Sequence, residues 1–79
     1  MMSAAQCRMA RTALGWSNSK LADEANVGVN TVSRFEQGSD VRMSSVDAMR
    51  QALEVGGVEF IAAGQNSPDG GPGIRLKRP

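Results

Sequence analysis

Four residues near the middle of the chain have side chains and a spacing suited to contacts with the base edges of DNA. They are Val29, Asn30, Ser33 and Arg34, which a helix would present away from its apolar inner face. Arginine can donate two parallel hydrogen bonds to guanine, asparagine can pair in both directions with adenine, and valine can contact the methyl group of thymine. Polar residues on the outer face of a helix also occur simply because that face meets water. The residue types therefore allow base recognition without requiring it.

The segment from Ser17 to Gly38 supplies the elements that would hold these side chains in place. It predicts two short helices joined by a tight turn. Ser17 is a suitable N-cap for the first helix, Asn26 tolerates the left-handed conformation that ends it, and Gly38 supplies the stop signal of the second. Two helices that cross steeply at such a turn can place the second one in the major groove of DNA.

A helix is also predicted on the N-terminal side of this segment. Apolar residues recur at helical spacing through Ala4–Leu14, with Cys7 on the inner face and with Gln6 and Arg8 toward solvent. Cys7 is expected to be a small buried residue, because no basic neighbour is evident that would lower the pKa of its thiol. Trp16, which follows this helix, is expected to anchor the packing of a small core.

A fourth helix is predicted after the loop that follows Gly38. Ser44 or Ser45 is expected to cap its start, and Gly56 and Gly57 are expected to end it. Its apolar stripe, which we expect to complete the core, consists of Val46, Met49 and Leu53.

Beyond the fourth helix the apolar period changes from helical spacing to alternation. Alternation runs through Val58–Ala62 and returns in Ile74–Lys77, after a turn segment rich in Gly and Pro. The pattern predicts a β-hairpin, with a disordered tail as the alternative. Because an isolated two-stranded ribbon is marginal in water, we expect it to pack across a two-fold axis and to form a dimer contact. The residues predicted for this contact are Phe60, Ile61, Ile74 and Leu76, and a dimer through the fourth helix is the alternative.

Composition limits the classes of protein that the sequence can specify. The chain has 79 residues and a net charge of +1, its basic and acidic side chains balance through Gly56, and it has one cysteine and no histidine. We expect a single small domain with modest nonspecific attraction to DNA, so that a dimer with well-placed contacts would be needed for useful binding. No apolar run approaches the roughly 20 residues of a membrane span, and no secretion signal is evident. We therefore expect a cytoplasmic protein with no membrane partner, no metal and no cofactor.

The residues from about Arg8 to about Leu53 resemble the phage repressor and Cro-type, or XRE-like, helix-turn-helix family. The resemblance rests on Leu14-Gly15-Trp16-Ser17, Leu21-Ala22, Ala25, Val27, Thr31-Val32 and Phe35-Glu36-Gln37-Gly38. It implies a mainly α fold: a compact four-helix repressor-type helix-turn-helix domain over residues 1–56, with a short C-terminal β-hairpin or strand arm over residues 57–79 as the dimer contact.

The resemblance also implies roles for individual side chains. In this family an arginine in the first helix pairs with the glutamate that ends the reading helix, and here these residues are Arg11 and Glu36. We expect a largely internal ion pair. Asn18 stands where the family usually has a glutamine that contacts a phosphate, and Gly28 stands where the family usually caps the reading helix with Ser or Thr. Contacts with the DNA backbone are predicted for Ser17, Asn18, Lys20, Gln37, Ser39 and Arg42.

These observations favour a sequence-specific transcriptional regulator, with repression as the expected mode, that binds a palindromic site in double-stranded DNA as a homodimer. An antitoxin that binds both operator DNA and a toxin is the alternative. A protein-interaction module that keeps the fold without binding DNA is a third, weaker interpretation. An enzyme is not expected, because the sequence offers no histidine, no tyrosine, no base beside its cysteine and no phosphate-binding loop.

Overall fold

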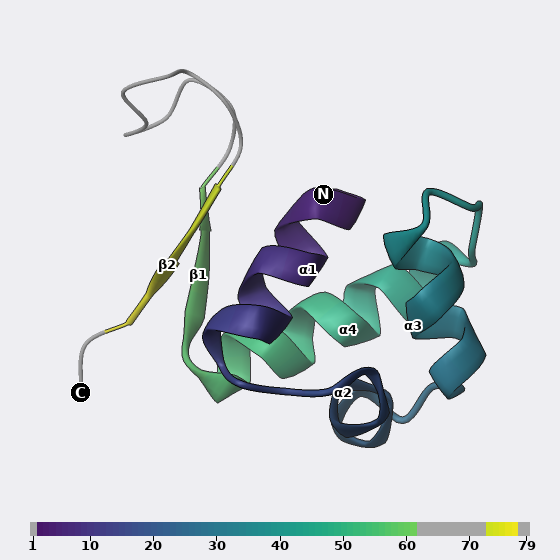
Figure 1. Cartoon of the computed structure of the whole chain (residues 1–79), viewed down its shortest axis with the longest axis horizontal. Coiled ribbons are helices and arrows are strands. Elements are labelled where there is room, and N and C mark those ends of the chain that lie inside the picture. The colour runs from purple at the N-terminus through teal and green to yellow at the C-terminus, as the bar shows by residue number, and fades with distance from the viewer. Residues whose placement is uncertain (1, 62–72, 78–79) are drawn as a thin grey trace.

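Four helices and one β-hairpin make up the part of the chain that the computed structural model describes, which is residues 2–61 and 73–77. In chain order the helices are α1 (Ala4–Ala13), α2 (Asn18–Ala25), α3 (Val29–Glu36) and α4 (Met43–Gly56). The strands that follow are β1 (Val58–Ile61) and β2 (Gly73–Leu76). Figure 1 shows the hairpin standing beside α1 and the C-terminal part of α4, with α3 at the opposite end of the molecule. The predicted mainly α fold with a short C-terminal hairpin is confirmed.

The helix ends follow local rules of capping. Ser17 caps α2 by accepting a hydrogen bond from the amide of Lys20, and Asn26 ends this helix in the left-handed conformation with φ of 56°. Gly28 is the N-cap of α3 and offers no side-chain bond. Gly57 ends α4 with φ of 120°, a conformation that favours glycine.

The predicted start of the fourth helix is wrong by a few residues. α4 begins at Met43, and its N-cap is Arg42, whose side chain makes no capping bond. The carbonyl of Arg42 accepts hydrogen bonds from the amides of Ser45 and Val46, so both serines already lie inside the first turn. The helix therefore starts without a side-chain cap, and neither serine is needed for one.

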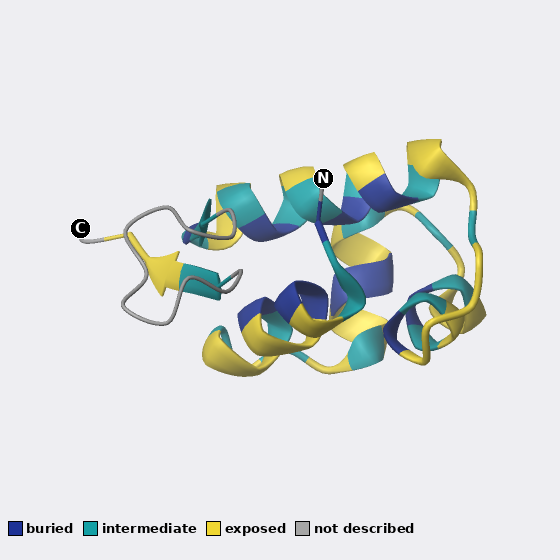
Figure 2. Ribbon diagram, turned by 90° about the horizontal axis from the view of Figure 1, so that it is seen from above, coloured by how far each residue is buried: buried dark blue, intermediate teal, exposed yellow. Residues whose placement is uncertain are grey.

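The core lies between the four helices and extends under the hairpin. Figure 2 shows the buried surfaces of the helices facing one another while their outer surfaces are exposed. The large side chains of the core that have no exposed surface come from α2, α3, α4 and β1, and they are Leu21, Val32, Met49, Leu53 and Val58. The stripe predicted for α4 is buried as expected, since Val46 is also only 3% exposed.

The two strands pair with each other in an antiparallel register. Val58 lies opposite Leu76, Glu59 opposite Arg75 and Phe60 opposite Ile74. Because residues alternate between the two faces of a strand, the apolar pairs share one face and the Glu59–Arg75 ion pair lies on the other. Phe60 and Ile74 pack against the core of the same chain. The hairpin therefore rests on its own helices, which provide the support that we had expected from a second copy. Ala62 and the predicted turn segment lie outside the described residues.

Gln6 is buried, which contradicts the prediction that it faces solvent. Its side chain is 4% exposed, and its Nε2 donates to the carbonyls of Ile61 (3.0 Å) and Gly73 (3.1 Å), the last paired positions of the two strands. Its Oε1 accepts from the amide of Ser3, which completes a capping box at the start of α1. The spacing Ser3-x-x-Gln6 was a readable signal for the capping box, but nothing local to it indicated the bonds to the strands.

Candidate nucleic-acid interface

α2 and α3 are held at a steep angle by a short turn that is itself packed. The left-handed Asn26 reverses the chain, and the amide of Val27 donates back to the carbonyl of Ala22 at 3.0 Å. Leu21 and Val32, on the inner faces of the two helices, have no exposed surface. The outer face of α3 is consequently left toward solvent at one end of the molecule (Figure 1).

Three of the four side chains predicted to read bases lie on this outer face. Val29, Asn30 and Arg34 are exposed, and Val29 retains 43% of its surface although it is apolar. The side chain of Arg34 makes no ion pair or hydrogen bond with any described residue, although its carbonyl accepts from the amide of Ser39. Ser33 differs from the others, because it is half-buried and its Oγ accepts a hydrogen bond from Asn18 Nδ2 at 3.1 Å. Asn18, predicted to contact the DNA backbone, and Ser33, predicted to contact a base, are thus hydrogen-bonded to each other.

The residues predicted to contact the DNA backbone lie in two places, at the start of α2 and around the end of α3. Ser17 is exposed but its Oγ is already engaged as the N-cap of α2. The ammonium of Lys20 is 2.9 Å from Glu24 Oε1 and 5.7 Å from the centre of the Trp16 ring. Lys20 therefore lies toward the α4 side of α2.

The other three backbone candidates lie at and beyond the end of α3. Gln37, Ser39 and Arg42 are all exposed. A hollow of about 650 Å³ separates α3 from the loop before α4, and both Arg34 and Arg42 line it together with Asp40. The two guanidinium groups outnumber the one carboxylate, so the hollow favours an anionic ligand such as a phosphodiester.

An ion pair fixes α3 against α1 behind this surface. Arg11 Nε and Nη2 donate to the two carboxylate oxygens of Glu36, each at 2.9 Å, and Arg11 Nη1 donates to the carbonyl of Trp16 at 3.0 Å. Glu36 is almost fully buried, and Arg8 lies 3.6 Å from it on the solvent side. Burial alone would raise the pKa of Glu36, but the hydrogen bonds and charge of Arg11 outweigh it and lower the pKa. The carboxylate stays ionised and holds α3 against α1.

Cys7 lies beside the same carboxylate and has no environment that would activate it. Its Sγ donates weakly to Glu36 Oε2 at 3.5 Å, and its side chain has no exposed surface. Burial, reinforced by the negative charge of Glu36, raises the pKa of the thiol from 9.0 to about 12. The thiol is therefore protonated at neutral pH and is inert as a nucleophile.

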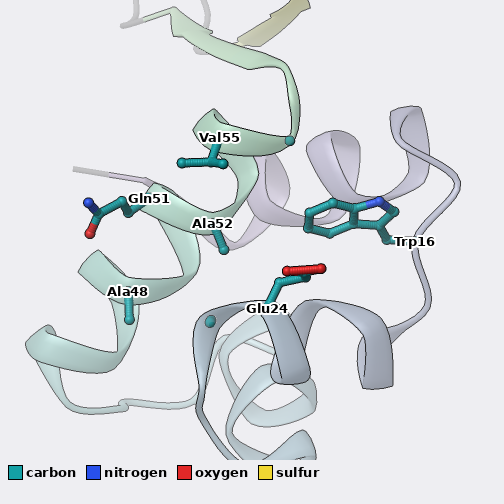
Figure 3. A pocket seen from close by; sticks show the side chains of 8 residues that line it. Trp16, Glu24, Ala48, Gln51, Ala52 and Val55 are labelled. Atoms are coloured by element: carbon teal, nitrogen blue, oxygen red, sulfur yellow. The ribbon is translucent and has the colours of Figure 1, made fainter.

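A second hollow, of about 400 Å³, lies between α2 and α4, away from the outer face of α3. Figure 3 shows the ring of Trp16 and the carboxylate of Glu24 on one side of it, with Ala52 and Val55 of α4 on the other. The ring also packs closely on Gly56, where an added Cβ would stand 2.8 Å from two ring carbons. Trp16 is thus half-buried and in contact with the core.

No helix in the described ranges is both long enough and apolar enough to span a bilayer. A family model described as helix-turn-helix matches residues 8–60, which is more than half of the chain and includes all four helices apart from the first turn of α1. A comparison with curated proteins finds no match to the chain.

Proposed function

We propose that this chain, which belongs to the XRE-type helix-turn-helix family and is a DNA-binding transcription regulator, is a repressor that occupies a palindromic operator as a homodimer. In this proposal α3 enters the major groove and reads bases with Val29, Asn30, Ser33 and Arg34. The loop between α3 and α4 follows the DNA backbone, with Arg42 as its main contact. Occupation of the operator then blocks access to the promoter.

The observation that carries the proposal is the unpaired outer face of α3. Arg34 and Asn30 are exposed and free of partners among the described residues, although this chain pairs other cations, such as Arg11, Lys20 and Arg75, with acids. Because the Arg11–Glu36 ion pair already fixes α3 from behind, binding to a base does not have to order the backbone of this helix, and only the arginine side chain loses rotamer freedom. Such preorganisation favours specific contacts over bulk charge.

The low net charge supports a dimer that binds through placed contacts. With a net charge of only +1, one copy is attracted to DNA only weakly at long range, whereas two copies on one site double the number of phosphate contacts and the counterions that these contacts release. The hairpin remains our proposal for the dimer contact. Phe60 and Ile74 are largely used by their own core, so Leu76, which is 50% exposed, and the outer edges of the strands are the parts that can face a second copy.

The experiment is selection of bound sequences from a random duplex library at fixed, near-physiological salt. We expect an enriched palindrome with half-site centres about ten base pairs apart, as for other dimers of this kind. The Arg34→Ala variant should relax one position in each half-site, because it removes one base contact and leaves the rest.

A matched control removes an equal charge elsewhere. Arg50→Gln, on α4 where the side chain pairs with Glu54, should leave every position of the motif as it is, whatever it does to overall affinity. Weak, salt-sensitive retention with no enriched motif contradicts the proposal. An enriched motif without two-fold symmetry, together with a monomer in sedimentation equilibrium, contradicts its dimer part alone.

A further inference from the structure

We propose that β2 pairs along its outer edge with β2 of a second copy of the chain, so that two hairpins form one continuous antiparallel sheet across a two-fold axis. This pairing is the dimer contact of the proposed function, on which the inference rests. It consists of main-chain hydrogen bonds in a fixed register, with Arg75 at the axis.

The hydrogen bonds inside the hairpin decide which main-chain groups point away from it. The amide of Lys77 donates to the carbonyl of Gly57 at 2.7 Å, so these residues form a hydrogen-bonded pair just beyond the strand ends. In an antiparallel ladder such pairs alternate with pairs that exchange no hydrogen bonds. Continuing the register from this pair leaves Ile74 and Leu76 in pairs of the second kind, while Arg75 between them bonds to β1. The N–H and C=O groups of Ile74 and Leu76 therefore point away from β1.

These outward groups make β2 an open edge of the sheet. None of them has a hydrogen-bond partner among residues 2–61 and 73–77. The side chain of Leu76 is 50% exposed, whereas Val58, opposite it in β1, has no exposed surface. An exposed strand edge is a template for the pairing of another strand. Of the two strands, β2 is therefore the one whose edge can accept a partner.

A two-fold axis allows few registers for a strand that pairs with its own copy. With the axis at Arg75, Ile74 of each copy lies opposite Leu76 of the other, and the outward groups of both residues are all used. With the axis at Ile74, Leu76 would have to pair with Pro72, which has no N–H. With the axis at Leu76, Arg75 would lie opposite Lys77 of the other copy, and like charges directly opposite are destabilising. The register with Arg75 at the axis is therefore favoured.

Both faces of the joint sheet suit this register. Arg75 donates to Glu59 Oε1 within its own hairpin, so its guanidinium is neutralised and is directed toward β1, away from the axis. On the other face, Ile74 of each copy lies beside Leu76 of its partner and covers apolar surface that a single copy exposes. The arginines that meet at the axis are therefore already paired, and the apolar side chains gain contacts.

The same axis turns both α3 helices to one side. When antiparallel strands pair in one sheet, equivalent faces stay on the same side, so the helices of both copies lie against one face of the joint sheet. Figure 1 shows the helices on one side of the hairpin, with α3 at the end of the molecule opposite to it. Both α3 helices therefore lie on the same side of the joint sheet, as binding to a single palindromic duplex requires.

The first test is disulfide formation in Arg75→Cys. At the axis the two Cα atoms of position 75 would be about 4.5 Å apart, which is within the range of a disulfide. Oxidised glutathione should therefore convert most of this variant into a covalent dimer, measured on a non-reducing gel. The native Cys7 should not contribute, because it has no exposed surface and burial raises the pKa of its thiol to about 12. The unaltered protein, treated in the same way, gives the background.

Lys77→Cys is the matched control, because it also replaces one cation near the end of β2 with cysteine. Position 77 lies two residues from the axis, so its two copies would be about 13 Å apart along the strands, too far for a disulfide. This variant should cross-link roughly ten times more slowly than Arg75→Cys. Equal rates for the two variants, or no covalent dimer of Arg75→Cys, would overturn the inference.

The second test removes an outward N–H. A proline at position 76 fits an edge strand, because the N–H of Leu76 is not used inside the hairpin. Compared with Leu76→Ala, Leu76→Pro should raise the Kd of the dimer about thirtyfold in sedimentation equilibrium, the effect of two lost hydrogen bonds. The amide of Arg75, which points toward β1, should stay protected from hydrogen exchange in both variants. Equal dissociation constants for the two variants would contradict the pairing.

The outcomes separate this pairing from the proposed function. If Arg75→Cys does not cross-link while the unaltered protein sediments as a dimer and enriches a palindrome, the edge pairing is wrong and the proposed function stands. A covalent Arg75→Cys dimer, together with no enriched motif for the unaltered protein, would refute the proposed function and support the pairing. An unaltered protein that stays monomeric at every concentration in sedimentation equilibrium would overturn the inference.

Discussion

Removing the buried charge of Glu36 should destabilise the protein more than the loss of any single surface charge. In Glu36→Gln the side chain keeps its size, but Arg11 and Arg8 lose their counter-charge, and an amide NH₂ must face one of the Arg11 donors. Breaking a buried ion pair from one side costs about 3–5 kcal/mol. We take the lower end, about 3 kcal/mol, because the Arg11 side chain keeps 19% of its exposure and can regain some water.

The assay is urea and thermal unfolding followed by circular dichroism. For a domain of this size a loss of about 3 kcal/mol corresponds to a fall in Tm of roughly 12–24 °C. Glu24→Gln is the matched control, because Glu24 pairs with Lys20 at 2.9 Å on the surface of one helix, where such a pair contributes about 0.3–0.5 kcal/mol. The double variant Arg11→Met with Glu36→Leu should recover most of the stability, since it leaves no buried charge unpaired.

The pH dependence gives an independent check of the same reasoning. The pKa of Glu36 is lower in the folded chain than its ordinary value of 4.5, so its contribution to the free energy of unfolding is complete above that value. The contribution is lost as the pH falls through the folded pKa, because protonation then favours the unfolded chain. The gap in stability between the unaltered protein and Glu36→Gln should therefore be full at pH 7 and should shrink below about pH 4. A cost below about 1 kcal/mol at pH 7, or a gap that does not change with pH, would refute the ion-pair argument.

Two further substitutions test how the hairpin and Trp16 are attached to the helices. Gln6→Leu should lower the free energy of unfolding by about 2 kcal/mol and speed hydrogen exchange in both strands, because two strand carbonyls lose a buried donor. The control is Gln51→Leu, on the exposed face of α4, which should have neither effect. Strand amides that stay protected from exchange in Gln6→Leu would contradict this prediction. Gly56→Ala should cost about 1–3 kcal/mol and change the fluorescence of Trp16, because the new Cβ would stand 2.8 Å from the ring. Gly28→Ala is the control, because its Cβ would stand 3.7 Å from its nearest neighbour and the substitution should cost only about 0.5 kcal/mol. Equal losses of stability for the two glycine substitutions would show that the Trp16 ring moves aside at no cost.

Local sequence patterns were enough to predict the four helices, the turn between α2 and α3 and the exposed face of α3. These features depend on residues within a few positions of one another. Ser17 caps the amide three residues later, Asn26 turns the chain where it stands, and the apolar spacing of α3 leaves Asn30 and Arg34 on the outside. The pairing of Arg11 with Glu36 came from resemblance to a family, because no local pattern connects two residues 25 positions apart.

The position of the hairpin and the hydrogen bonds of several polar side chains depend on packing between elements that are distant in the sequence. Gln6 reads as a solvent residue of an amphipathic helix, yet it bonds to carbonyls 55 and 67 residues away. The alternation in the strands specified an apolar face, but not whether that face covers the same chain or a second copy. Asn18 and Ser33 each looked like a separate DNA contact, and only the packing of α2 on α3 joined them. Periodicity records which side of an element avoids water, whereas the partner on that side is fixed by how distant elements fill a shared volume.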